Sequence, residues 1–159
     1  EAEAALLKLV FGDLLAEIHH IGSTSIPGIH AKPIIDIMPL VYDIEAVDSY
    51  NAVMEALGYQ AWGEYGIPGR RYFPRAPKRR THQVHIFQLG AEHVARHLAF
   101  RDYLRAHPAK AMLYSNHKRL MAIQHPYDII GYMEGKDALV KQLEAEALAW
   151  RQAQQNGNR

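Results

Sequence analysis

The sequence predicts an α+β fold in which a mixed sheet is covered by helices and followed by an all-helical C-terminal third. In the first 90 residues, short segments alternate apolar and polar residues with the period of two that strands require. After Gly90 the apolar spacing changes to three and four residues, which is the period of a helix. Strands are therefore expected near residues 17–21, 34–41, 71–75 and 82–89, and none beyond residue 92.

Length and composition indicate a single domain over residues 1–159, with an α/β core at 1–90 and a helical part at 91–159. The chain has 48% hydrophobic and 22% charged residues, which is ordinary for a globular protein. The formal net charge of +1 does not by itself indicate whether the chain binds nucleic acid. We do not expect nucleic acid as a partner. The oligomeric state is left open.

The chain has no cysteine, which excludes disulfides, thiolate zinc sites and a cysteine nucleophile. This composition agrees with a reducing compartment, and we expect a cytoplasmic protein. No apolar run approaches the roughly 18 residues of a membrane span, and no signal peptide is recognisable. Residue 1 is Glu rather than Met, so we expect the natural start of the chain to lie upstream.

Two helices are expected among the strands of the first 90 residues. Residues 2–16 carry apolar side chains at helical spacing. Asp43 is a suitable N-cap for a second helix, and Gly58 ends it. The apolar face of this second helix consists of Val47, Tyr50, Met54 and Leu57. Both stripes are predicted to pack on the sheet.

Between the second helix and the last strand, residues 59–62 could form a short strand. Residues 63–77 are rich in Gly and Pro and predict a loop, with a strand near 71–73. The C-terminal third is predicted as four helices, because Pro108 begins a new helix and Gly135 interrupts another. Their expected ranges are 92–106, 108–124, 126–135 and 136–153.

Ser23 and Asp36 are the first candidate functional residues. Gly22 and Ser23 end an apolar strand with a polar turn, and Asp36 lies within the next apolar strand. Two neighbouring strand ends could bring these side chains to one place. A carboxylate in an apolar strand is costly unless a partner pairs with it. Asp36 is therefore either a capping or salt-bridged residue, or a ligand for a metal or for a phosphate-bound metal.

This arrangement resembles the start of nucleotidyltransferase superfamily members. In them a Gly-Ser turn precedes, by roughly a dozen residues, a strand that carries Asp-x-Asp or Asp-x-Glu. Backbone N–H groups at such a turn can hold phosphate, and the carboxylates hold magnesium. Here Asp36 stands at the first carboxylate position, but Met38 stands at the second. A thioether is too soft to replace a carboxylate for magnesium, which argues against two-metal catalysis.

A basic run and a histidine are further candidates. Six Lys and Arg side chains lie between residues 70 and 80 with no acid among them. The run is either a solvated loop or a rim that binds phosphate through Arg. On the strand at 82–89, His82 and His85 point to opposite faces. Of the two, His85 is the better candidate for a metal ligand, because a neutral imidazole binds zinc, manganese or nickel well. The alternative is that His85 is only hydrogen-bonded within a cleft.

Several motifs in one order resemble the GrpB family (UPF0157-type), nearly from end to end of the chain. The residues that carry this resemblance are His20–Gly28, Lys32–Asp36, Arg71–Phe73, Thr81–His85, Phe100–Pro108, Tyr114, Lys118–Leu120, Asp128, Tyr132 and Gly135–Lys136. The resemblance implies a nucleotidyltransferase-like fold without a known reaction. Family members usually carry an upstream segment with a Trp and a Phe, which is absent from this sequence.

The resemblance also implies which positions carry function. Asp36 and His85 are the expected catalytic pair and the expected ligands of one divalent metal, which could be Mg, Mn or Zn. Nucleotide or phosphate would be bound by Gly22, Ser23, Lys32 and Arg71. The residues expected to support the site are His20, Tyr114 and Lys118.

Three functions remain open at this point. The first is a nucleotidyl- or phosphoryl-transferase. The second is a domain that binds a nucleotide or another phosphorylated small molecule without catalysis. The third is an interaction or folding-helper domain, because similar domains are fused to some dephospho-CoA kinases, which suggests a kinase domain as partner. In the first two, Ser23, Asp36 and His85 are expected to converge in one cleft.

Overall fold

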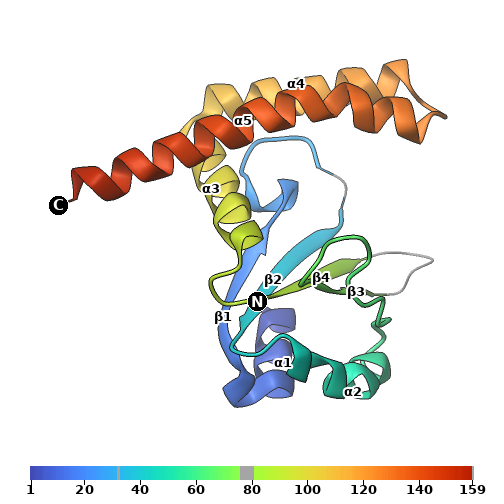
Figure 1. Ribbon diagram of the computed structural model, residues 1–159. Helices are drawn as coiled ribbons and strands as arrows, with labels where there is room; N and C mark the ends of the chain where they lie inside the picture. The colour runs from blue at the N-terminus through green and yellow to red at the C-terminus, as the bar shows by residue number, and fades with distance from the viewer. Residues whose placement is uncertain (32, 76–80, 159) are drawn as a thin grey trace. The chain divides into compact units, whose positions relative to one another are not determined.

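The computed structural model describes residues 1–31, 33–75 and 81–158 (Figure 1). The chain divides into two compact units. Unit 1 consists of Glu1–Gly22 and Pro33–Val94, and contains the sheet. Unit 2 consists of Ser23–Lys32 and Ala95–Arg159, so a segment between the first two strands belongs to the helical part. That both units act as one domain stays a prediction.

Unit 1 is built on a four-stranded mixed sheet with the order β1-β2-β4-β3. Its strands are β1 (Leu15–Ile21), β2 (Ile35–Val41), β3 (Arg71–Pro74) and β4 (His82–Gln88). β1 runs antiparallel to β2, β2 parallel to β4, and β3 antiparallel to β4. No strand follows residue 92 in the part of the chain that the structure describes. The predicted mixed sheet and the predicted strand positions are confirmed.

The central strand β2 is buried on both faces, which explains its nearly continuous apolar sequence. Ile37 is 6% exposed on one face, and Met38 is fully buried on the other. The register places Ile37 opposite Val84 and Asp36 opposite Gln83. Because side chains alternate along a strand, Asp36 and Gln83 lie on the face opposite to Ile37 and Val84.

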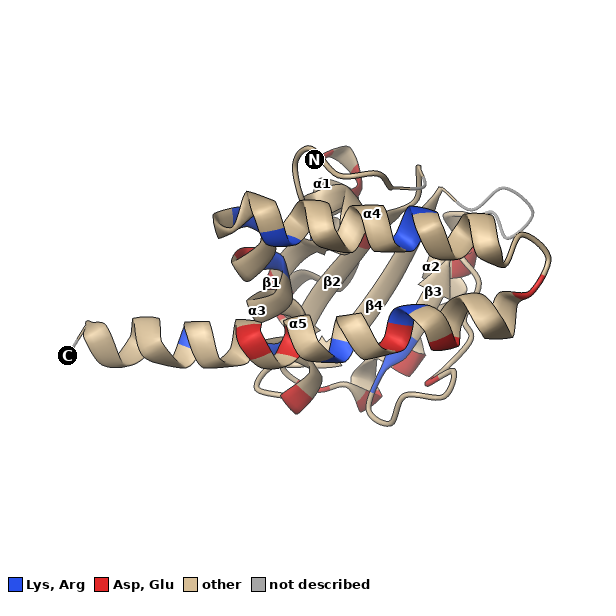
Figure 2. Ribbon diagram, turned by 90° about the horizontal axis from the view of Figure 1, so that it is seen from above, with Lys and Arg blue, Asp and Glu red and all other residues tan. Residues whose placement is uncertain are grey.

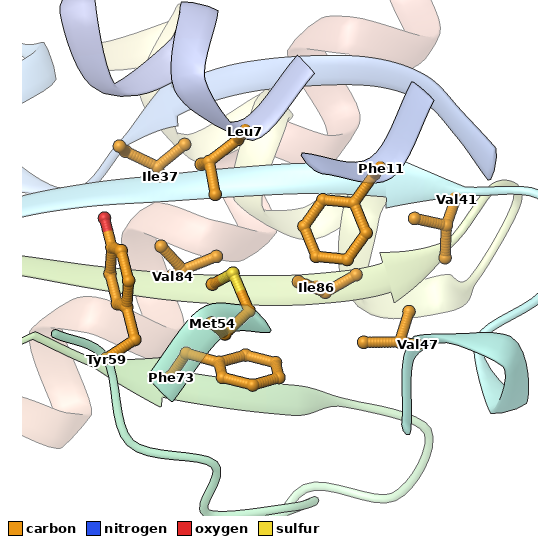
Figure 3. Close-up of a cluster of buried hydrophobic side chains, with 10 residues drawn as sticks. All are labelled: Leu7, Phe11, Ile37, Val41, Val47, Met54, Tyr59, Phe73, Val84 and Ile86. Atoms are coloured by element: carbon orange, nitrogen blue, oxygen red, sulfur yellow. The ribbon is translucent and has the colours of Figure 1, made fainter. Parts of the chain in front are cut away.

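One face of the sheet packs against α1 (Ala2–Phe11) and α2 (Asn51–Ala56), and forms the core of unit 1 (Figure 3). The ring of Phe11 points from α1 into this core, and Met54 reaches it from α2. The buried cluster consists of Leu7, Phe11, Ile37, Val41, Val47, Met54, Tyr59, Phe73, Val84 and Ile86. The predicted apolar stripes of the two helices therefore belong to the core.

The helices of unit 1 are shorter than the sequence predicts. The first helix ends at Phe11 instead of residue 16, because Gly12 has a φ of 50° and starts a 3-10 turn that leads into β1. The second begins as a 3-10 helix, η3 (Glu45–Tyr50), before α2. The expected strand at 59–62 is reduced to a single bridge between Tyr59 and Arg75.

Unit 2 contains a one-turn 3-10 helix and three long helices, one of which, α3, begins in unit 1. They are η2 (Ser23–Ser25), α3 (Glu92–Ala106), α4 (Pro108–Gln124) and α5 (Ile129–Gly157). Pro108 stands in the first turn of α4, as predicted. The core of this unit consists of Ile26, Ala99, Tyr103, Leu104, Ala111, Tyr114, Leu143 and Ala147.

One prediction for the C-terminal helices is wrong, because α5 passes through Gly135 without interruption. A glycine inside a helix costs only about 1 kcal/mol relative to Ala, so packing can override it. Here the missing side chain gives room to the sulfur of Met121 on α4. The carbonyl of Gly135 also accepts a hydrogen bond from the ring of His117, at 2.8 Å.

Candidate functional site

Asp36 and His85 are brought together by the two parallel strands at the centre of the sheet. Asp36 is the second residue of β2, and its partner on β4 is Gln83, two residues before His85 on the same face. The Nε2 of His85 lies 2.9 Å from Oδ1 of Asp36. Their side chains are 16% and 23% exposed, so this is a half-buried pair that solvent can reach. Asp36 thus has the partner that its apolar strand requires.

Gly22, which follows directly after β1, lies against the carboxylate of Asp36. Its φ is 73°, and a Cβ added there would lie 2.6 Å from Oδ2 of Asp36. A residue with a side chain would meet both the strain of a left-handed backbone and a clash with the carboxylate. Glycine is therefore required at this position by the close approach of the backbone to Asp36.

Arg70 is a residue of this cluster that sequence reasoning did not single out. It is 8% exposed, and its Nη1 lies 3.4 Å from Nδ1 of His85. Its Nε donates to the carbonyl of Glu64 at 3.1 Å, and its Nη2 donates to the carbonyl of Tyr65 at 2.8 Å. The guanidinium also lies 4.9 Å from the ring centre of Tyr72. In the sequence Arg70 is one of six bases, and nothing there distinguishes it.

The charge of Arg70 is not balanced by a carboxylate. Among the described residues, no Asp or Glu lies within ion-pair distance of its guanidinium. Burial lowers the pKa of Arg70, which reflects the cost of desolvating a cation. Arg remains charged even so, because its ordinary pKa is above about 12. A buried guanidinium without a carboxylate is the arrangement that an anionic ligand can complete.

The hydrogen-bond pattern assigns the protons of the His85 ring. A guanidinium can only donate, so Nδ1 of His85 accepts from Arg70. In the neutral ring the proton is then on Nε2, which donates to Asp36. Both ring nitrogens are engaged, although the contact of 3.4 Å with Arg70 is long for a hydrogen bond.

Aromatic side chains surround Arg70. The rings of Tyr65 and Tyr72 stack at 5.3 Å with an interplanar angle of 12°, and Trp62 lies 4.9 Å from Tyr65. Tyr72 also lies 5.2 Å from the ring of His85. Tyr65 is 59% exposed, so this aromatic group reaches the surface. Such a surface suits stacking with a planar ligand.

Two residues predicted for the site lie on the other face of the sheet. Arg71 shares its face with Phe73 of the core, and its guanidinium pairs with Asp48 at 2.7 and 3.4 Å. The hydrogen bond from Arg71 to Asp48 raises the pKa of Arg71. His20 pairs with Ile37, so its side chain also points away from Asp36. The structure does not bring Arg71 or His20 together with His85.

Three further residues predicted for the site meet within unit 2. The Nζ of Lys118 donates to Oγ of Ser23 at 2.8 Å, and it lies 5.1 Å from the ring centre of Tyr114. Arg105 also contacts the η2 turn that contains Ser23, because its Nε donates to the carbonyl of Ser25 at 2.8 Å. Lys118 on α4 therefore contacts the loop after the first strand.

Part of the predicted site lies outside the residues that the structure describes. Lys32 lies outside the described residues, as does the part of the basic run at 76–80. The convergence of Ser23 with Asp36 and His85 in one cleft stays a prediction.

A resident divalent metal fits the described residues poorly. Nowhere in the described chain do three or more His, Cys, Asp or Glu side chains form a group that could hold an ion. At the Asp36–His85 pair the described residues supply two possible ligands, and the guanidinium of Arg70 adds a positive charge beside them. Met38 supplies a buried thioether, which magnesium does not bind. The binding of one Mg, Mn or Zn ion by Asp36 and His85 remains a prediction.

None of the described helices is long and apolar enough to cross a membrane.

Comparison with known proteins shows the family. The family described as "GrpB protein" matches residues 1–146. The UPF0157 protein YqkA of Bacillus subtilis is 49% identical over 158 residues, which are 99% of this chain but 46% of that protein. The glutamate-rich protein GrpB of Alkalihalophilus pseudofirmus is 30% identical over 148 residues, 90% of this chain and 85% of that protein.

The fold agrees with a solved structure. The crystal structure of the conserved protein GrpB from Enterococcus faecalis is similar with a TM-score of 0.90 and 45% identity, over 94% of this chain and 90% of that chain. The chain spans about half the length of YqkA, so it corresponds to a part of that relative. The sequence match over most of the chain and the shared fold lead to one conclusion: the chain belongs to the GrpB family.

Proposed function

We propose that the chain binds a nucleotide or another phosphorylated small molecule at the face of the sheet that carries Asp36, His85 and Arg70. The observation that supports this most is the buried guanidinium of Arg70, which no described carboxylate balances. Phosphate oxygens match the planar donor fork of Arg and would supply the missing negative charge. A ligand phosphate is therefore the natural partner of this group.

The aromatic residues favour a nucleotide over a bare phosphate ester. Tyr65 and Tyr72 stack beside Arg70, and Tyr65 is exposed. A base could stack on this surface while the phosphates contact the guanidinium.

Binding without catalysis is favoured over phosphoryl or nucleotidyl transfer. A general base needs a free nitrogen within reach of the proton that it removes. Both nitrogens of His85 are engaged, by Asp36 and by Arg70. Met38 at the second carboxylate position also argues against a two-metal reaction. An enzyme would have to release His85 from one of its partners when substrate binds.

The experiment is a thermal-shift and calorimetric screen of ATP, GTP, dephospho-CoA and inorganic phosphate, each with and without Mg²⁺, Mn²⁺ and Zn²⁺. We expect at least one phosphorylated compound to raise Tm, and Arg70→Gln to abolish the shift. Arg71→Gln removes the same charge from the other face of the sheet. It should lower Tm through the loss of the Asp48 pair but keep the ligand-induced shift.

The proposal fails if no phosphorylated compound is bound by the wild-type chain, or if Arg70→Gln binds as well as the wild type. The folding-helper function would then lead. It would be tested by the refolding yield of a fused or added kinase domain.

A further inference from the structure

Tyr65 has a backbone conformation that tyrosine rarely adopts. Its φ is 46°, and among the described residues it is the one non-glycine residue with a positive φ. Gly66 follows with a φ of 84°, and the N–H of Ile67 donates to the carbonyl of Glu64 at 3.2 Å. Two positive φ values closed by this hydrogen bond are those of a type I′ turn, which favours Asn, Asp or Gly at its first central position. A bulky side chain at this position strains the backbone.

The loop around this turn is held by hydrogen bonds, two of which come from Arg70. Between residues 57 and 70 the chain has one acid, Glu64, and one base, Arg70 (Figure 2). The guanidinium donates to the carbonyls of Glu64 and Tyr65, at 3.1 and 2.8 Å. The carboxylate of Glu64 accepts from the backbone N–H of Gly69. The strained turn is therefore fixed to the guanidinium at which the phosphate is proposed to bind.

The ring of Tyr65 is not buried, so the strain does not serve the core. Tyr65 is 59% exposed, whereas Tyr72 is 4% exposed. One face of the Tyr65 ring stacks on Tyr72 at 5.3 Å, and the ring of Trp62 lies 4.9 Å away with an interplanar angle of 58°. Much of the Tyr65 ring thus stays open to solvent at the outer end of an aromatic stack. Residues that combine strain with exposure cluster at binding sites.

We propose that Tyr65 binds the base of a nucleotide ligand, and that a purine is preferred to a pyrimidine. The inference rests on the proposed function, because it requires a phosphorylated ligand at Arg70. The guanidinium of Arg70 contacts the backbone of Tyr65 and lies 4.9 Å from the ring centre of Tyr72, so the sites for base and phosphate adjoin. Stacking on an aromatic side chain accepts every base, and the larger ring system of a purine offers more contact area.

The strain has a role in this arrangement. The type I′ turn fixes the position of the Tyr65 ring before the ligand binds, so less side-chain freedom is lost on binding. An unstrained residue such as Asn would form the same turn but would offer no ring to the base.

The contribution of the base is measured by calorimetry with AMP, CMP and ribose 5-phosphate. The wild-type chain should bind AMP about tenfold more tightly than ribose 5-phosphate, which carries the same phosphate but no base. The affinity for CMP should lie between the two, because a pyrimidine has the smaller ring system. In Tyr65→Asn the advantage of AMP over ribose 5-phosphate should disappear, while the affinity for ribose 5-phosphate itself should not change.

Three controls separate the ring from the loop. Tyr65→Phe keeps the ring and should bind AMP within about twofold of the wild type. Tyr42→Asn removes a tyrosine of similar exposure, 62%, directly after β2 and should leave all three affinities unchanged. Circular dichroism and Tm show that each variant is folded, and Asn at position 65 tolerates the left-handed backbone.

The fluorescence of Trp62 locates the base. The chain has two Trp residues, so Trp150→Phe leaves Trp62 as the sole one. Because the ring of Trp62 lies 4.9 Å from that of Tyr65, a base stacked there should change its emission. AMP should produce this change, and ribose 5-phosphate should not.

The inference fails alone if a phosphorylated compound of the thermal-shift screen binds but AMP binds no more tightly than ribose 5-phosphate. It also fails alone if Tyr65→Asn keeps the preference for AMP. If neither these three compounds nor any compound of the screen binds, the inference and the proposed function fail together.

Discussion

The ring of His85 joins Asp36 to Arg70: its Nε2 lies 2.9 Å from Oδ1 of Asp36, and its Nδ1 lies 3.4 Å from the guanidinium of Arg70. A carboxylate, an imidazole and a guanidinium thus form one chain of hydrogen bonds on one face of the sheet. This chain gives the acid in an apolar strand a hydrogen-bond partner, while the charge of Arg70 still has no described carboxylate within ion-pair distance.

The first prediction concerns the protons of this chain. The neutral ring of His85 should carry its proton on Nε2, because Arg70 can only donate to Nδ1. Long-range ¹H–¹⁵N NMR of the histidine ring nitrogens distinguishes the two tautomers. The Nδ1–H tautomer would contradict the arrangement. Arg70→Met removes the donor at Nδ1 and should change the chemical shift of that nitrogen, and His82, on the opposite face, is the internal reference.

The second prediction concerns ligand binding. Asp36→Asn and His85→Ala should each weaken the binding of the phosphorylated ligand found in the screen, because the first removes the negative charge that holds the ring of His85 and the second removes the ring that contacts Arg70. Calorimetry of the wild type and both variants, with and without divalent metal, measures this. If both variants bind with wild-type affinity, the pair is a remnant without function.

The third prediction separates backbone strain from the close contact at Gly22. Gly22→Ala should lower the free energy of unfolding by about 1–3 kcal/mol through its left-handed backbone, and further through the clash with Asp36. Gly28 has a similar φ of 78° but no atom near the position of a Cβ, so Gly28→Ala has only the backbone cost. Urea denaturation measures both. Equal losses would mean that Asp36 moves aside without cost.

The fourth prediction concerns the contact between Lys118 and Ser23. Lys118→Ala removes a hydrogen bond at 2.8 Å and a cation–π contact, and should cost about 1–3 kcal/mol of stability. Lys136→Ala is the matched control, because Lys136 lies 5.5 Å from the ring of Tyr132 in the same i, i+4 relation. Thermal unfolding compares the two.

Two outcomes of the Lys118→Ala experiment differ in meaning. Lower stability with unchanged ligand affinity shows that Lys118 braces the loop at Ser23. Unchanged stability with weaker ligand binding shows that Lys118 belongs to the binding site.

The fifth prediction concerns acid stability. Burial raises the pKa of Glu3, but the hydrogen bond from Tyr59 and the charge of Arg75 outweigh this effect, and the pKa is lowered. A lowered folded-state pKa adds stability that is fully present above the unfolded-state value of about 4.3 and is lost as the pH falls through the folded-state pKa.

Glu3→Gln should therefore lower Tm at pH 7, and the difference from the wild type should shrink as the pH approaches 3. Thermal unfolding at several pH values measures it. The exposed Glu55 on α2 provides the control, since Glu55→Gln should show little difference at any pH. A difference that is constant from pH 7 to pH 3 would contradict the role of the Glu3 charge.

The sequence by itself determined the α+β class, the four strand positions, the core faces of the helices and the need of Asp36 for a partner. These features depend on local periodicity and on the cost of burying a charge, which can be read along the chain. His85 could be predicted as a site residue because it is a polar side chain on the strand at 82–89, on the face opposite to His82. Helix ends and the path through Gly135 were less predictable, because packing against Met121 overrides a local preference.

Only the tertiary structure decided which arginine joins the site. Arg70 and Arg71 are neighbours of the same type, but Arg71 is the first residue of β3 and pairs with Asp48, whereas Arg70 precedes the strand and reaches His85. The difference arises from the register of β3 on β4 and from the loop carbonyls that hold Arg70. The contacts of Arg70 with His85 and of Arg71 with Asp48 join residues 15 and 23 positions apart, so no local pattern encodes them.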